Sequence, residues 1–86
     1  MFQFYMSERL EKHLLEKMLR KRVIGSKHIR YENIVSSVPS HEIKNLKKTV
    51  ESLLKKGYLV WYSKSKKAIQ LNKYKLKEIK IYLTSN

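Results

Sequence analysis

The stretch from Pro39 to Leu71 constrains the fold of this chain more than any other. It reads PSHEIKNLKKTVESLLKKGYLVWYSKSKKAIQL. Apolar residues recur at helical spacing in its first half, and Gly57 follows them, where glycine commonly ends a helix. Two runs rich in β-forming residues come next, joined by the lysine-rich segment 63–67. The stretch therefore predicts a helix from 39 to 56 and a β-hairpin from 58 to 71.

The predicted 39–56 helix has one apolar side and one polar side. Proline suits its first position, because a backbone N–H is not needed there. The polar side is expected to face solvent or a ligand, so it holds the first candidate binding residues. The apolar side consists of Ile43, Leu46, Val50, Leu53 and Leu54, and the polar side of Ser40, His41, Lys44, Asn45, Lys47 and Lys48.

The two β-rich runs alternate so that one face of the predicted hairpin points toward the core. Side chains two residues apart lie on the same face of a strand. Leu59 and Trp61 therefore face one way, and Ile69 and Leu71 match them on the partner strand. This alternation predicts that Trp61 packs in the core.

The rest of the chain predicts further helices on both sides of this stretch. Residues 7–24 carry a periodic apolar stripe, with Ser7 as the N-cap and Gly25 as the residue that ends the helix. The remaining segments are an extended stretch (26–30), a short second helix (31–36) and a last helix (73–83) capped by Asn72.

The predicted elements belong to one domain. A chain of 86 residues has no room for a second core, so a single domain over 1–86 is expected. Its fold class is α+β and mostly helical. Three helices form the core, a two-stranded hairpin is attached to it, and one more helix follows at the C-terminal end.

The charge of the chain is strongly one-sided. The sequence has 20 Lys and Arg residues against 7 Asp and Glu, a formal net charge of +13. This exceeds the net charge of roughly 2–8 that keeps a small domain soluble. Such an excess stores self-repulsion, which the binding of a polyanion relieves. The charge therefore indicates a nucleic acid as partner, and the alternative is a solvated lysine surface with no partner.

The segment 26–72 resembles the winged helix-turn-helix domains of small archaeal DNA-binding proteins and transcription regulators. The resemblance rests on the turn VPS (38–40), the helix end LLKKGYL (53–59) and the hairpin after it. These signatures are shared by a large superfamily, so they indicate the fold better than the function. The resemblance implies that the 39–56 helix enters the major groove and that the hairpin, the wing, contacts the adjacent backbone or minor groove.

The residue types agree with these implied roles. Asn45 is suited to an adenine edge, and Lys44 or Lys48 to guanine acceptors or a phosphate. Hydroxyl and backbone N–H groups at a helix start commonly hold phosphate, and wing lysines displace counterions. For each lysine the alternative is a solvated face. The predicted DNA-binding residues are Arg30, Ser40, His41, Lys44, Asn45, Lys47, Lys48, Lys64, Lys66 and Lys67.

Aromatic residues leave a further alternative open. Trp61 and the six tyrosines are residue types on which unpaired bases stack. Against this, Trp61 is in phase with Leu59, which indicates the core. Basic residues also do not alternate with aromatic ones along one clear strand face.

Several classes of function find no support in the sequence. Without cysteine the chain has neither disulfides nor thiolate ligands, and the histidines (13, 28 and 41) have no partners at zinc-ligand spacing. No nucleophile motif or glycine-rich phosphate loop is present. We therefore expect no enzyme activity, metal or cofactor. No run approaches the ~18 apolar residues of a membrane span, and the expected location is intracellular, on the nucleoid.

Both ends of the chain are apolar beyond what a minimal winged helix needs. Regulators of this kind commonly dimerise, because two half-sites set the site spacing. We therefore predict a homodimer built from the first and last helices, the alternative being closure of the chain's own core. The predicted interface residues are Phe2, Phe4, Leu76, Ile79, Tyr82 and Leu83.

The sequence favours a double-stranded DNA-binding protein that regulates transcription by recognising a specific sequence. One alternative is an architectural protein that coats duplex DNA, because lysine far outnumbers arginine and arginine is the better base reader. Another is a winged helix that contacts RNA or protein. The sequence identifies no small-molecule effector and no DNA target.

Overall fold

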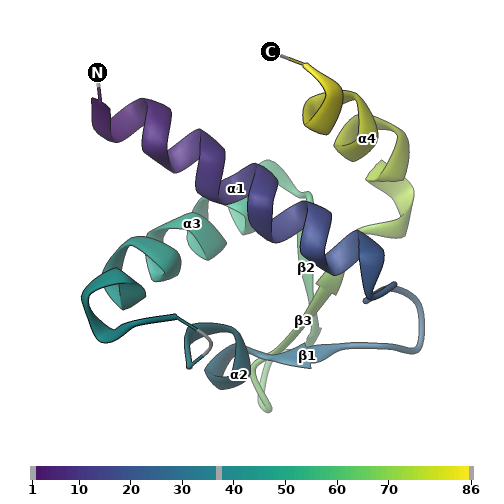
Figure 1. Cartoon of the computed structure of the whole chain (residues 1–86). Helices are drawn as coiled ribbons and strands as arrows, with labels where there is room; N and C mark the ends of the chain where they lie inside the picture. Colours follow the sequence, from purple (N-terminus) through teal and green to yellow (C-terminus); the bar gives the residue numbers. More distant parts are fainter. Residues whose placement is uncertain (1, 37, 86) are drawn as a thin grey trace.

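The computed structural model describes the backbone of residues 2–36 and 38–85, and the side chains from residue 8 onward in these ranges. The fold is α+β and mostly helical, with a small antiparallel sheet on one side of the helices (Figure 1). In chain order the elements are α1 (Phe2–Arg20), β1 (Ile29–Arg30), α2 (Tyr31–Val35), the 3-10 turn η1 (Ser40–Glu42), α3 (Ile43–Lys56), β2 (Leu59–Ser63), β3 (Ala68–Leu71), the 3-10 turn η2 (Lys73–Lys75) and α4 (Leu76–Thr84).

The three strands form an antiparallel sheet in the order β1-β3-β2. The predicted hairpin is confirmed, with Leu59 opposite Leu71 and Trp61 opposite Ile69. The stretch 26–30, predicted to be extended, ends in β1, whose Ile29 and Arg30 pair with β3. The strand β3 is therefore central, and the first half of the chain is joined to the hairpin through it.

The core lies between α1, α3, α4 and one face of the sheet. Leu15 on α1, Val50 on α3 and Ile79 on α4 have no accessible surface. Burial of this apolar surface is the main force that joins the helices to the sheet. The core residues are Leu14, Leu15, Met18, Val23, Ile34, Leu46, Val50, Leu53, Leu59, Ile69, Leu71 and Ile79.

The predicted boundaries of the first helix are wrong at both ends. The helix begins at Phe2, so Ser7 lies inside it and is not its N-cap. It ends at Arg20, well before Gly25, because Arg22 takes a left-handed conformation with φ of 53°. The N–H of Val23 then bonds the carbonyl of Met18 at 3.0 Å, a common way to satisfy the last turn of a helix.

The other predicted helices are close to those observed. The second helix ends at Val35 rather than at residue 36. The 39–56 helix begins with η1 and is α-helical from Ile43, and Gly57 ends it with φ of 81° as expected. The last helix likewise begins with a 3-10 turn, in which the Asn72 side chain accepts a hydrogen bond from the Tyr74 N–H at 3.0 Å.

The prediction that Trp61 packs in the core is wrong. Its side chain is 38% exposed, although its neighbour on the same strand face, Leu59, is buried. The register of β2 against β3 shifts between Trp61 and Ser63, which marks a β-bulge. A bulge breaks the simple alternation of side chains, and this one lies next to the hairpin turn.

Candidate nucleic-acid interface

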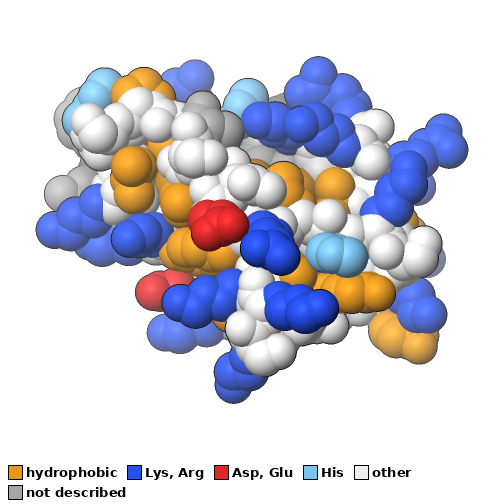
Figure 2. Space-filling view, turned by 90° about the horizontal axis from the view of Figure 1, so that it is seen from below, with side chains coloured by type: hydrophobic (Ala, Val, Ile, Leu, Met, Phe, Trp, Pro, Cys, Tyr) orange, Lys and Arg blue, Asp and Glu red, His pale blue; other side chains and the backbone are white. Residues whose placement is uncertain are grey.

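A groove of about 550 Å³ lies between α2, α3 and the turn of the hairpin. Four cationic side chains line it, one from β1, one from α3 and two from the hairpin turn. Figure 2, which looks at the molecule from the side of α2 and the hairpin turn, shows Lys and Arg side chains bordering this face on several sides. The lining residues are Arg30, Tyr31, Glu32, Val35, Lys47, Ser65, Lys66 and Lys67.

Backbone contacts hold the two walls of this groove together. The N–H of Tyr31, at the start of α2, donates to the carbonyl of Lys67 at 2.8 Å. Arg30 pairs with Ala68 in the sheet. The hairpin turn therefore has a fixed position relative to α2, and its lysines are presented beside α3 rather than on a free loop.

The balance of charge in the groove is positive. Among the described residues that line it, Glu32 is the one carboxylate. It forms an ion pair with Arg30 at 3.6 Å, in which both side chains are more than half exposed. Such an exposed pair is weak, so it leaves the arginine available to another anion. Burial, together with the negative charge of Glu51, raises the pKa of Tyr31. The phenol therefore stays protonated at neutral pH and can donate a hydrogen bond to an acceptor in the groove.

The structure brings part of the predicted DNA-binding set together. All of its residues are exposed, and the groove collects Arg30, Lys47, Lys66 and Lys67. The remaining predicted lysine of the hairpin, Lys64, is exposed in the same turn but is not among the residues that line the groove.

The other predicted residues of η1 and α3 are not among those that line the groove. Lys48 lines a second groove, on the side of α3 that faces α1 and α4. Asn45 precedes Lys47 by two positions. Two residues of an α-helix are about 200° of rotation about its axis, so Asn45 lies on nearly the opposite side of α3 from Lys47. Ser40 and His41 lie on η1, where the imidazole of His41 is 3.7 Å from the carboxylate of Glu42.

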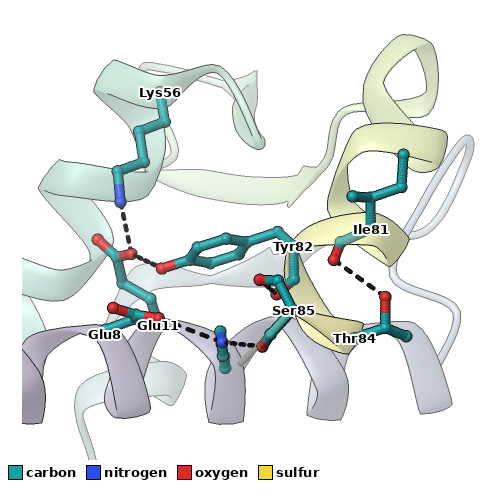
Figure 3. A network of polar contacts seen from close by, with 8 residues as sticks. Glu8, Glu11, Lys56, Ile81, Tyr82, Thr84 and Ser85 are labelled. Atoms are coloured by element: carbon teal, nitrogen blue, oxygen red, sulfur yellow. Dashed lines mark hydrogen bonds and ion pairs between the residues drawn. The ribbon is translucent and has the colours of Figure 1, made fainter.

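The second groove, of about 530 Å³, holds a polar cluster that the sequence interpretation missed (Figure 3). The carboxylate of Glu11 is almost completely buried between α1, α3 and α4. It accepts hydrogen bonds from Lys56 Nζ at 2.6 Å, Ser52 Oγ at 2.5 Å and Tyr82 Oη at 2.5 Å. A signal was present, because Glu11 shares helical spacing with the buried Leu14, Leu15 and Met18.

This cluster lowers the pKa of Glu11. Burial by itself would raise it, but the hydrogen bonds from Lys56, Ser52 and Tyr82 and the charge of Lys56 outweigh burial. For Tyr82, burial and the bond to Glu11 raise the pKa. At neutral pH the carboxylate is therefore charged and the phenol protonated, so one charged acceptor on α1 is bonded by donors from α3 and α4.

The residues predicted for a dimer interface largely serve the chain's own core. Ile79 is fully buried and cannot contact a partner, which corrects its assignment. Leu76 is half-buried, and Tyr82 and Leu83 pack against the core. The side chains of Phe2 and Phe4 lie outside the described residues. A homodimer stays a prediction, and a monomeric mass by light scattering would contradict it.

In the part of the chain that the structure describes, no group of three or more His, Asp or Glu residues is placed to hold a metal ion. Among the helices of residues 2–36 and 38–85, none is long and apolar enough to span a bilayer.

Neither family models, nor curated proteins, nor solved structures gave a match to this chain.

Proposed function

We propose that this protein is a winged-helix protein that binds double-stranded DNA. The order of its elements supports the proposal, because a short strand, two helices and a hairpin follow one another in the chain. The pairing of the short strand with the hairpin supports it further. In such an arrangement α3 is the recognition helix and the β2–β3 hairpin is the wing.

The observation that carries the proposal is the cationic groove between α2, α3 and the hairpin. Arg30, Lys47, Lys66 and Lys67 come from three separate segments and converge on one hollow. A solvated lysine surface needs no such convergence, whereas a phosphate backbone in this groove would meet several cations at once. Each cation that neutralises a phosphate releases counterions, so this groove would supply most of the affinity.

In this proposal the first half of α3 lies in the major groove and recognises a sequence, as in a transcription regulator. Lys44 and Asn45 are exposed there, and an asparagine amide is complementary to an adenine edge. One observation favours the second candidate, an architectural protein without sequence preference. The groove collects four cations, which suit phosphate contacts, whereas Asn45 is not among the residues that line it.

Selection from a randomised duplex pool separates the two candidates. The protein is also titrated with one fixed duplex over about 50 to 300 mM salt, where phosphate contacts give a steep linear dependence. Enrichment of a motif supports the regulator, and a palindrome would also support a dimer. Tight binding with a steep salt dependence and no motif supports the architectural protein. No duplex binding at the lowest salt contradicts the proposal.

A further inference from the structure

The β-bulge in the hairpin exposes two consecutive aromatic side chains. Trp61 is opposite Ile69 and Ser63 is opposite Ala68, so Tyr62 has no partner residue on β3. In a β-bulge the extra residue is left without a partner on the neighbouring strand, and the direction of a side chain changes. Trp61 is 38% exposed and Tyr62 is 47% exposed. The regular pairing of β2 with β3 is therefore interrupted where Trp61 and Tyr62 are exposed to solvent.

Tyr62 forms a stacked pair with His28, from the loop that joins α1 to β1. The two ring centroids are 4.1 Å apart and the ring planes differ by 11°. This contact is not needed to attach the loop, because the Gln70 amide donates to the carbonyls of Gly25 at 2.7 Å and of Lys27 at 2.9 Å. The Gln70 side chain thus holds the loop through the loop's backbone carbonyls. Both stacked rings remain exposed.

The segments that carry the two rings are strongly positive. No acidic residue occurs between Glu16 and Glu32, or between Glu51 and Glu78, in the sequence. Tyr62 is followed closely by the hairpin lysines, and His28 by Arg30. The exposed cations of the loop before His28 are Lys21, Arg22 and Lys27.

We propose that the stacked pair of His28 and Tyr62 is a binding platform for single-stranded nucleic acid. Planar side chains bordered by cations suit a strand whose bases are unpaired, because a base stacks on the ring while its phosphates meet the cations. A duplex hides the faces of its bases within its own stack, so it gains nothing from these rings. The inference shares Arg30 and hairpin lysines with the proposed duplex binding, but its two rings are not among the residues that line the groove between α2, α3 and the hairpin turn.

The test compares three labelled probes of equal length: oligo(dT), oligo(rU) and a duplex. Tyr62→Ala and His28→Ala are expected to weaken single-strand binding about fivefold or more, the effect of losing one stacked base. Duplex affinity is expected to change less than about twofold, because its phosphate contacts remain. The two single-stranded probes distinguish DNA from RNA as the preferred strand.

Matched variants separate stacking from structure. Tyr74→Ala removes an 83% exposed tyrosine on η2 and is expected to leave single-strand binding unchanged. Tyr62→Phe keeps the ring and should retain the affinity that Tyr62→Ala loses. Circular dichroism confirms that each variant is folded, and quenching of the single tryptophan, Trp61, reports occupancy beside the platform.

Three results would overturn the inference. The first is wild-type single-strand affinity in Tyr62→Ala and His28→Ala. The second is a parallel loss of single-strand and duplex binding in these variants. The third is no binding of either single-stranded probe at low salt. Because the duplex is measured separately, failure of this inference is distinguishable from failure of the proposed duplex binding.

Discussion

Glu11 on α1 and Lys56 on α3 form an ion pair of 2.6 Å in which the carboxylate side chain is only 4% exposed. The lysine is 44% exposed, so its charge is still partly hydrated. Tyr82 on α4 donates to the same carboxylate oxygen (Figure 3). A buried charge with three donors is costly to disturb, because each donor left behind loses its partner. The cluster therefore fixes how α4 and α3 lie against α1.

Glu11→Gln is expected to lower the free energy of unfolding. The amide keeps the shape of the side chain but removes the charge. Its NH₂ group replaces one of the two accepting oxygens, either the one bonded by Ser52 or the one bonded by Lys56 and Tyr82. The expected loss is about 1–3 kcal/mol, the range for an unsatisfied buried group. Urea unfolding followed by circular dichroism measures it. Glu16→Gln, at an exposed position of the same helix, is the control. Equal effects of the two substitutions would contradict a stabilising role for the cluster.

The stability that Glu11 contributes is expected to disappear in acid. Because its pKa is lowered in the folded state, the contribution is fully present above the ordinary pKa of 4.5. It is lost as the pH falls from there through the lowered value. The difference in unfolding free energy between the wild type and Glu11→Gln should be constant from neutral pH down to about 5, and then shrink. A difference that grows below pH 4.5 would contradict this assignment.

Gly57→Ala is expected to destabilise the fold at the junction of α3 and β2. Gly57 has φ of 81°, in the left-handed region, where a Cβ costs roughly 1–2 kcal/mol. The added Cβ would also meet the end of the Lys75 side chain at 3.4 Å, but that flexible chain can move aside. Urea unfolding is again the measurement. Gly57→Asn, which tolerates this conformation better, should lose less, and an alanine variant as stable as the wild type would refute the argument.

Lys66→Ala is expected to weaken duplex binding equally on all sequences. Lys66 lines the cationic groove and is expected to neutralise a phosphate, so its loss should lower the salt dependence by about one unit of slope. Fluorescence anisotropy over a range of salt concentrations measures this. Lys77→Ala, at an exposed position of α4, has the same change of charge and is expected to leave the slope nearly unchanged. Identical slopes for the two variants would mean that the groove is not the contact surface.

Asn45→Ala tests recognition of bases by α3. If Asn45 contacts an adenine, the substitution reduces the discrimination between a selected sequence and random DNA by about 1–3 kcal/mol. Its backbone carbonyl already accepts from Thr49 Oγ1 at 2.8 Å, and this bond does not involve the side chain, so the helix should stay intact. Competition binding on the two duplexes gives the result. Equal losses on both would remove Asn45 from the base-reading residues.

The sequence predicts the four cations of the cationic groove as binding residues, but only in part how these residues come together. The exposure of the lysines at 64, 66 and 67 follows from a polar turn between two β-rich runs. The same pattern does not predict that Lys47 and Arg30 line one groove with Lys66 and Lys67. The position of Lys47 depends on how α3 packs against the sheet. The position of Arg30 depends on the pairing of β1 with β3, which the sequence does not specify, since a strand of only two residues carries almost no signal.

By itself the sequence determined the helices with a periodic apolar stripe, the glycine that ends α3 and the hairpin after it. These features depend on neighbours along the chain, so local patterns suffice. Only the tertiary structure decided that Glu11 is buried, that Trp61 is exposed and that Tyr62 stacks on His28. Glu11 meets Ser52 across 41 residues of chain and Tyr82 across 71. The burial of a side chain depends on which distant segments cover it, and that is settled only when the helices and the sheet pack together.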